Sequence, residues 1–224
     1  MKAAIGVLLS VLLAAGAQAQ GFVRMEMLPI PSVTLTTEQI LSGDLNGKPV
    51  TVAGQLRIPK AGTEKLPAII MVHGSGGLSA SADAWAREFN SIGLAVLVLD
   101  SFAGRGIVST VNDQSQLDHL AMAVDTYRAL DILAKHPRID PARIAVIGYS
   151  KGAVAAVYSA TARFRKLLGT EAEFAAHIGM YTPCNTATLP TATTTRSRAS
   201  RSGCITASRT TGSPSSRAAP IRRA

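Results

Sequence analysis

The chain has 224 residues, 47% of them hydrophobic, and two cysteines, which suits one globular domain and excludes both a wholly disordered chain and a disulfide framework. Its formal net charge of +9 is unevenly placed, because residues 186–224 hold seven Arg and no acidic residue, whereas residues 1–185 hold 16 Lys and Arg against 14 Asp and Glu. This distribution excludes a basic, nucleic-acid-binding body.

Residues 1–19 have the pattern of a secretory signal peptide. A positive start at Met1-Lys2 precedes an apolar run over 3–15, which is too short to span a bilayer, and Ala17-Gln18-Ala19 forms a small-x-small cleavage site. We expect cleavage after Ala19 and an exported, periplasmic or secreted, protein without a stable membrane anchor. A retained N-terminal anchor is the alternative.

Strands alternate with helices from residue 50 to residue 181. An alternating pattern predicts a half-buried strand, continuous apolar runs predict buried ones, and helical spacing predicts helices. The predicted strands are 50–58, 68–72, 94–99, 144–147 and 175–181, and the predicted helices are 82–92, 117–135 and 153–162. This order predicts an α/β fold with a mainly parallel sheet and helices on both faces.

Residues 148–152, Gly-Tyr-Ser-Lys-Gly, match the G-x-S-x-G pattern between a predicted strand and a predicted helix. This context is typical of a nucleophile elbow, in which a sharp turn exposes the serine hydroxyl above the sheet. Ser150 is therefore the predicted nucleophile, and Gly148 and Gly152 leave room for the turn. A glycine-flanked turn with an incidental serine is the alternative.

Residues 73–77, His-Gly-Ser-Gly-Gly, follow the predicted strand 68–72 and resemble the oxyanion loop of esterases. Glycines such as Gly74 let backbone N–H groups approach a developing oxyanion closely. We expect the N–H groups of Ser75 and Lys151 to be the donors and His73 to be a structural residue, rather than a general base, at the edge of a substrate pocket. The alternative is a glycine-rich turn that serves only the topology.

Three further charged side chains are candidates for the site. Lys151 can be considered as a base, although neighbouring residues of an elbow usually point apart. Asp100 ends a predicted strand and Arg105 follows in a glycine-containing loop. These two residues either line a substrate pocket or belong to an ordinary solvated turn.

The stretch from Leu66 to Asn185 resembles the dienelactone hydrolase family of α/β-hydrolases, in its exported, serine-nucleophile branch. The resemblance is carried by LPAIIMVHGSGG, GLAVLVLDSFAGRG, HPRIDPARIAVIGYSKGA and HIGMYTPCNT. It implies an α/β-hydrolase fold and acyl transfer through a covalent acyl-enzyme, with no cofactor and no metal. Well-known members have cysteine at the elbow, so Ser150 implies a general small-molecule ester or lactone as substrate.

The serine triad of this fold is incomplete in the sequence. The fold orders its triad as Ser, then Asp or Glu, then His. No Asp follows Ser150, and the one later histidine, His177, lies within a predicted strand. The catalytic Asp and His are therefore not found in this chain, and a serine without a positioned base is a weak nucleophile. We expect a domain over 20–185 that lacks the last strands of its sheet.

Residues 186–224 hold nine Thr, seven Ser and seven Arg with few large apolar residues, which predicts a disordered tail without a buried strand. Shifting the codon frame by one base permits L-Y-H-G-I-A-D-D-W-V-P over residues 204–214, which is very like the segment that carries the family's catalytic acid. Our hypothesis is an out-of-frame translation from near Thr186, with the acid encoded across codons 209 and 210. A genuine basic tail is the alternative.

The sequence thus predicts a serine hydrolase of esters or lactones, impaired in this chain. Two other functions stay open: a secreted hydrolase-fold binding protein without a triad, and an anion-binding arm built from the basic tail.

Overall fold

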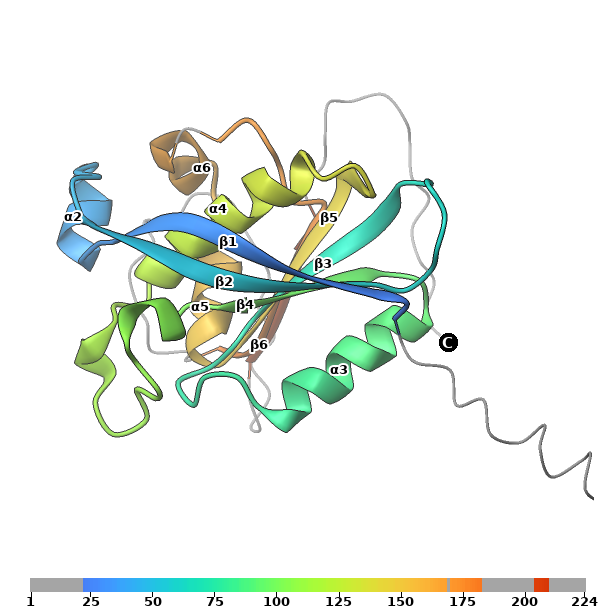
Figure 1. The fold of residues 1–224 in the computed structure, drawn as a ribbon. Helices are drawn as coiled ribbons and strands as arrows, with labels where there is room; N and C mark the ends of the chain where they lie inside the picture. The colour runs from blue at the N-terminus through green and yellow to red at the C-terminus, as the bar shows by residue number, and fades with distance from the viewer. Residues whose placement is uncertain (1–21, 169, 183–203, 210–224) are drawn as a thin grey trace, which may run out of the picture.

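The computed structural model describes residues 22–168, 170–182 and 204–209, which form a seven-stranded sheet flanked by helices (Figure 1). The strand order is β1-β2-β4-β3-β5-β6-β7, and the four strands β4, β3, β5 and β6 are parallel, whereas β1, β2 and β7 pair antiparallel. The strands are β1 (Arg24–Thr34), β2 (Lys48–Ile58), β3 (Leu66–Val72), β4 (Ala95–Asp100), β5 (Ile139–Tyr149), β6 (Ala176–Thr182) and β7 (Cys204–Arg209). The predicted α/β fold with a mainly parallel sheet is confirmed.

Helices cover both faces of the sheet, with α3 on one side and α4 and α6 on the other (Figure 1). The α-helices are α2 (Thr37–Ser42), α3 (Ala80–Ser91), α4 (Ala121–Ala134), α5 (Lys151–Tyr158) and α6 (Ala162–Leu168), and short 3-10 turns are η2 (Ala103–Arg105) and η3 (Gln114–Gln116).

The apolar runs of β3 and β4 are buried on both faces because successive side chains of a strand point to opposite sides. Ile70 and Leu97 belong to the large core that includes α4 and α5, whereas Ile69 and Val96 belong to the smaller core under α3. This two-sided burial explains why both strands are continuous apolar runs in the sequence.

Helix ends differ from the predicted ones where side chains bond to the backbone. The helix predicted over 117–135 begins at residue 121, because the backbone of Leu117 is extended, with φ −152° and ψ 123°. The carboxylate of Asp118 accepts a hydrogen bond from the N–H of Thr37 in α2. The helix predicted over 153–162 corresponds to α5, which ends at Tyr158, and α6 begins at the last residue of the predicted range. Ser159 and Thr161 donate to the carbonyls of Ala156 and Tyr158 at the break, and such local bonds compete with helix continuation.

The strands β1 and β7 and the helix α2 were not predicted, nor were the 3-10 turns and most of α6. The strand β1 contains Pro29 and Pro31. Proline is unfavourable within a sheet but is tolerated in an edge strand. Helix α2 begins with a capping box of Thr36 and Gln39 and ends at Gly43 with φ 85°. The strand β7 lies within the tail for which we predicted no regular structure, and it pairs antiparallel with β6. The predicted signal peptide and the other tail residues lie outside the described residues.

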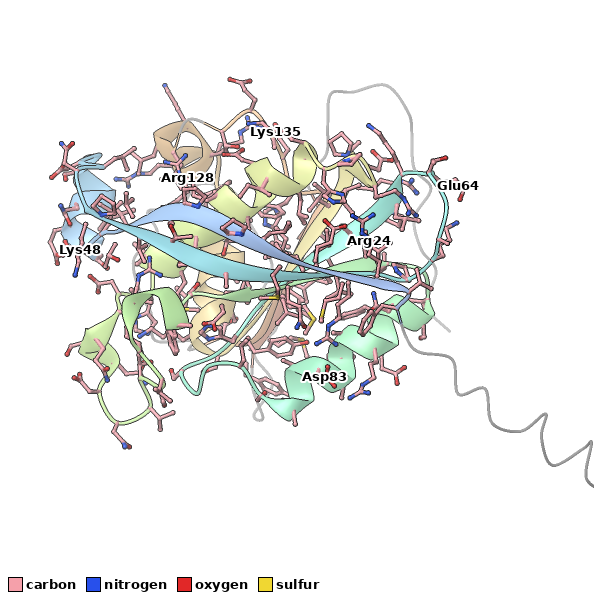
Figure 2. All side chains as sticks on the ribbon, viewed as in Figure 1. Arg24, Lys48, Glu64, Asp83, Arg128 and Lys135 are labelled. Carbon is pink, nitrogen blue, oxygen red and sulfur yellow. The ribbon has the colours of Figure 1, made fainter. Side chains whose placement is uncertain are left out.

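Charged side chains such as Lys48, Glu64 and Lys135 surround this core and are exposed (Figure 2). No helix in the described part of the chain combines the length and the apolar character needed to cross a membrane.

Candidate active site

Ser150 is exposed at the turn between β5 and α5. Its backbone has φ 51° and ψ −112°, a conformation that non-glycine residues rarely adopt and that costs roughly 1–3 kcal/mol. The strand ends one residue before it, at Tyr149, and the helix begins one residue after it, at Lys151. The strand-turn-helix context predicted for the G-x-S-x-G motif is therefore present.

The glycines of the elbow are required by close backbone contacts. A Cβ atom on Gly148 would lie 2.0 Å from the carbonyl oxygen of Gly152, and one on Gly152 would lie 2.4 Å from the carbonyl oxygens of Val72 and His73. Backbone atoms cannot move away as a flexible side chain can. A side chain on Gly148 would thus push α5 away from the end of β5, and one on Gly152 would push α5 away from the end of β3.

The loop after β3 reaches the elbow at Gly74. A Cβ atom there would lie 3.1 Å from the Tyr149 carbonyl oxygen and 3.4 Å from the Cβ of Ser150. The structure therefore brings together the two glycine-containing motifs that the sequence separates by more than 70 residues. The peptide between Gly74 and Ser75 lies beside the predicted nucleophile.

Two hydrogen bonds fix the orientation of that peptide. The Gly74 carbonyl oxygen lies 2.8 Å from Nδ1 of His73 and accepts a 3.1 Å bond from the N–H of Gly77. Because the C=O and N–H of a trans peptide point in opposite directions, these bonds also set the direction of the Ser75 N–H. The Ser75 N–H therefore has a defined direction beside Ser150.

His73 is held through both ring nitrogens. Its Nε2 accepts a 3.2 Å hydrogen bond from the N–H of Ser101, so Nδ1 carries the proton that is donated to Gly74. Burial lowers the pKa of His73, which keeps the ring neutral, as this arrangement requires. These two contacts leave neither ring nitrogen of His73 for Ser150.

The predicted oxyanion donors have free N–H groups within the described chain. Lys151 is the first residue of α5, where a backbone N–H has no carbonyl of the same helix to bond. No acceptor in residues 22–168 or 170–182 bonds the backbone N–H of Ser75 or of Lys151, whereas the N–H of Ser150 donates to the Met180 carbonyl at 2.9 Å. Both groups are available to a ligand oxygen.

Asp100 closes β4 and organises the next turn. Its Oδ1 accepts hydrogen bonds from the N–H groups of Phe102 at 2.9 Å and Ala103 at 3.0 Å. It lies 3.9 Å from Nε2 of His73, which is already bonded to Ser101. Asp100 thus caps a turn beside the site. Of the two roles expected from the sequence, this arrangement favours the ordinary turn over the substrate pocket.

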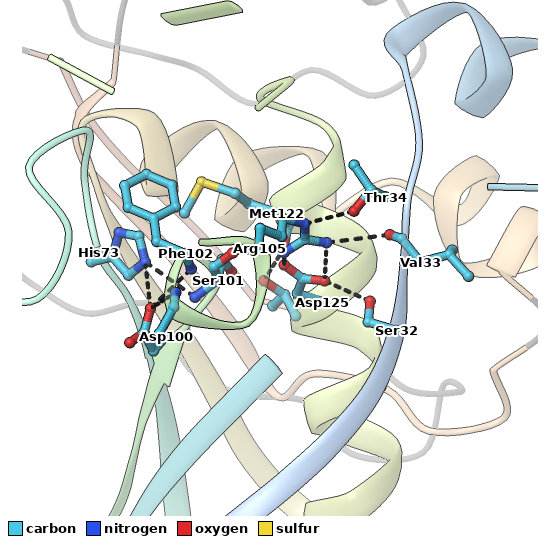
Figure 3. Close-up of polar contacts among 12 residues, drawn as sticks. Ser32, Val33, Thr34, His73, Asp100, Ser101, Phe102, Arg105, Met122 and Asp125 are labelled. Carbon is cyan, nitrogen blue, oxygen red and sulfur yellow. Dashed lines mark hydrogen bonds and ion pairs between the residues drawn. The ribbon is translucent and has the colours of Figure 1, made fainter. Parts of the chain in front are cut away.

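Arg105 does not line a pocket, because its guanidinium is buried in an ion pair with Asp125 of α4 (Figure 3). The Arg105 side chain is 5% exposed and that of Asp125 is 0% exposed. Two N–H groups of Arg105 bond the two carboxylate oxygens at 2.8 and 3.0 Å. The remaining three bond Thr34 Oγ1 and the carbonyl oxygens of Ser101 and Val33. All five guanidinium donors are therefore occupied, which leaves none for a substrate.

The Lys151 side chain turns away from its neighbour and is 1% exposed. Its Nζ donates to the Gln114 carbonyl oxygen at 3.0 Å, to Gln114 Oε1 at 3.3 Å and to Thr110 Oγ1 at 3.4 Å. Burial lowers its pKa, and the charges of Asp118 and Asp113 partly offset this. With its three protons directed at these oxygens, the amine forms no hydrogen bond with Ser150, which argues against Lys151 as the base.

No described acid or imidazole forms a hydrogen bond with Ser150. His177 lies in β6, where its Nδ1 is 2.9 Å from Ser159 Oγ and burial lowers its pKa to about 4. His136 contacts Glu26, and Glu173 pairs with Arg165. Among the described residues, therefore, the predicted nucleophile Ser150 and the predicted donors of Ser75 and Lys151 have no hydrogen-bonded base beside them.

A family model described as the dienelactone hydrolase family matches residues 52–197, which is more than half of the chain. The chain belongs to the dienelactone hydrolase family. Comparison with curated proteins finds no match.

Similar solved structures include esterases. A hyperthermophilic esterase from Pyrobaculum calidifontis is 23% identical with a TM-score of 0.50, over 81% of this chain and 51% of the esterase. A thermophilic carboxylesterase from a metagenomic library is 25% identical (TM-score 0.41, 67% and 45% coverage). A dienelactone hydrolase-like promiscuous phosphotriesterase, also metagenomic, is 19% identical (TM-score 0.43, 61% and 55%). This dienelactone hydrolase family member spans about half the length of these structures.

Two residues beside the site were missed by the sequence analysis. Asp125 is an acidic residue among the apolar positions of α4, and such a placement signals a buried cationic partner without naming it. Gln114 lies in a polar loop, where the sequence gives no signal that its amide bonds both Ser75 and Lys151.

Proposed function

We propose that this protein hydrolyses carboxylic esters or lactones, with Ser150 as the nucleophile. The observation that carries this proposal is the placement of the exposed, strained Ser150 against the Gly74–Ser75 peptide. An exposed hydroxyl beside two free backbone N–H groups is the arrangement that acyl transfer needs. Membership of the dienelactone hydrolase family, together with the fold it shares with solved esterases, supports the same chemistry.

In the proposed reaction, Ser150 Oγ forms a bond to the carbonyl carbon and loses its proton to a base. The carbonyl oxygen becomes an oxyanion that accepts hydrogen bonds from the N–H groups of Ser75 and Lys151. Collapse of this intermediate breaks the bond to the alcohol oxygen, which takes up a proton. Water then attacks the acyl-enzyme, releases the acid and restores the Ser150 hydroxyl. With a lactone, acid and alcohol leave as one hydroxy acid.

We further propose that this chain turns over slowly. Neither His177 nor any other described imidazole or carboxylate is hydrogen-bonded to Ser150, so proton removal falls to water or to a weakly placed group. A positioned general base contributes typically 10²–10⁴-fold to a rate. Single-turnover acylation is therefore a more sensitive readout than steady-state hydrolysis.

The test is covalent labelling with an alkyl fluorophosphonate, which phosphonylates an activated serine with loss of fluoride. Intact-mass spectrometry over hours should show one adduct that tandem spectrometry places on Ser150. The Ser150→Ala variant should stay unlabelled, and Ser91→Ala, which removes an exposed serine hydroxyl of α3 that bonds only the Glu88 carbonyl, should label like wild type. Labelling that persists in Ser150→Ala would refute the assignment.

A secreted binding protein with a hydrolase fold is the second candidate, favoured by the lack of a base at Ser150 within the described residues. It predicts no acylation in either form and ester binding that Ser150→Ala leaves unchanged. Equilibrium dialysis with a non-hydrolysable ketone analogue of an ester, alongside the labelling assay, distinguishes the two functions.

We also propose that residues 1–19 direct export and that residues 186–224 are translated out of frame. N-terminal sequencing of protein secreted by an expression host should begin at Gln20 if the signal is cleaved as predicted. Resequencing the coding DNA from about codon 180 onward tests the second proposal. A frame that stands as written would refute it.

A further inference from the structure

We propose that Gln114 is a positioning residue that fixes the spacing of the two oxyanion donors, and this inference rests on the proposed function of Ser150. The side chains of Ser75 and Lys151, whose backbone N–H groups are the proposed donors, share the amide oxygen of Gln114. We call Ser75, Thr110, Gln114 and Lys151 the Gln114 cluster.

The amide oxygen of Gln114 is the meeting point of this cluster. It accepts hydrogen bonds from Ser75 Oγ at 3.0 Å, from Lys151 Nζ at 3.3 Å and from Thr110 Oγ1 at 3.4 Å. Ser75 belongs to the loop after β3, Lys151 begins α5, and Gln114 begins η3. One side chain therefore joins the two segments between which an oxyanion would be held.

The buried ammonium of Lys151 makes this contact energetically important. A buried cation is costly unless its N–H groups are hydrogen-bonded, and within the described residues no carboxylate lies within ion-pair distance of Lys151. Its acceptors are neutral oxygens, two of them from Gln114. The amine therefore holds the loop over residues 109–117, which contains η3, against the first turn of α5.

Residues 109–110, which precede η3 in the same loop, bond the carbonyl oxygen of Ser75. The N–H of Thr110 donates to the Ser75 carbonyl oxygen at 2.8 Å, and Ser109 Oγ donates to it at 3.2 Å. Ser75 is thus held at its side chain by Gln114 and at its carbonyl by residues 109–110, while the preceding peptide is held by His73. Lys151 is bonded to this same loop.

Loss of the amide oxygen should let the donors drift apart. Donors act on an oxyanion only when they lie about 2.7–3.1 Å from it, and removal of one donor lowers kcat by roughly 10²–10³-fold. A displaced donor is a smaller defect than a missing one. We therefore expect Gln114→Met, which keeps the side-chain length but has no amide, to slow phosphonylation of Ser150 by about tenfold, because the phosphoryl oxygen occupies the same position as an oxyanion.

The experiment measures the fluorophosphonate reaction as a maximal rate constant, kinact, and a half-saturating concentration, KI. Gln114→Met should lower kinact and leave KI unchanged, because the donors act on the charged intermediate rather than on the bound reagent. Gln114→Glu should restore the rate, since a carboxylate also accepts from Ser75 and Lys151. The matched control is Gln116→Met in the same turn, because the Gln116 amide bonds only Ser109 and Asp113 of its own loop.

Amide hydrogen exchange provides a readout that does not depend on activity. Peptides covering 73–77 and 109–117 should exchange faster in Gln114→Met than in wild type or Gln116→Met. Equal kinact values for wild type and Gln114→Met, or unchanged exchange over 73–77, would overturn the inference. If wild type reacts no faster than Ser150→Ala, the proposed function fails, and the exchange result alone then decides whether Gln114 anchors the two segments.

Discussion

Removing the carboxylate of Asp125 should destabilise the fold more than any surface substitution. Asp125→Ala leaves the buried Arg105 guanidinium without a counter-charge, while Arg105 keeps its three neutral acceptors. The change also deletes the 2.5 Å hydrogen bond that Ser32 Oγ donates to Asp125. Breaking a buried pair from one side costs about 3–5 kcal/mol, which is a large part of the roughly 5–15 kcal/mol that stabilises a typical domain.

Urea unfolding followed by circular dichroism measures this cost. With a slope of about 2 kcal/mol per M, a loss of about 4 kcal/mol lowers the unfolding midpoint by about 2 M. The matched control is Glu64→Ala. Glu64 forms a surface ion pair with Lys60, and their side chains are 74% and 55% exposed. Such a pair contributes less than about 1 kcal/mol to stability.

A double variant separates the ion pair from the packing around it. Arg105→Met combined with Asp125→Leu replaces both charges by apolar groups and should recover much of the stability. The reasoning is refuted if Asp125→Ala shifts the midpoint no more than Glu64→Ala, or if the double variant is no more stable than Asp125→Ala alone.

Two other predictions concern the elbow and the pH dependence of stability. Gly152→Ala should abolish labelling of Ser150 and lower the melting temperature, because the new Cβ would lie 2.4 Å from the His73 carbonyl oxygen. The control is Gly76→Ala, whose Cβ would have no neighbour within 4 Å, and it should behave like wild type in both assays. His177, with its pKa lowered from 6.5 to about 4, binds its proton more weakly in the folded state than in the unfolded one, so stability should fall by about 3 kcal/mol as pH drops from 6.5 to 4. His177→Gln should remove that part of the slope in urea titrations at several pH values, and an identical slope in both proteins would contradict the prediction.

The features of the fold that can be predicted from the sequence are those that depend on residues close together in the chain. The apolar runs of β3 and β4 specify burial on both faces, and the glycines around Ser150 specify a tight turn between strand and helix, so the sequence alone located the central sheet and the elbow. The strand β1 escaped prediction because its two prolines argue against a strand everywhere except at an edge.

The polar contacts that hold the site in place were not predictable, because their partners are far apart in the sequence. Arg105 was assigned to a pocket or a solvated turn, yet it pairs with Asp125 twenty residues later and contacts Thr34 seventy-one residues earlier. Lys151 reaches Gln114 across 37 residues. Local pattern says which residues are polar, but only the fold decides which of them meet.

The two prolines of β1 also bear on how copies of the protein meet one another. Pro31 pairs with Thr51, and the Thr51 carbonyl is directed at η2, since a Cβ on Gly104 would lie 2.0 Å from it. The backbone of Pro31 therefore points away from β2, as does that of Pro29 two residues before it. The open edge of this terminal strand thus lacks two N–H groups, beside the exposed side chains of Met25 and Met27. A strand from a second copy could not form a continuous row of backbone hydrogen bonds with this edge. The two prolines therefore disfavour edge-to-edge aggregation at an apolar sheet edge.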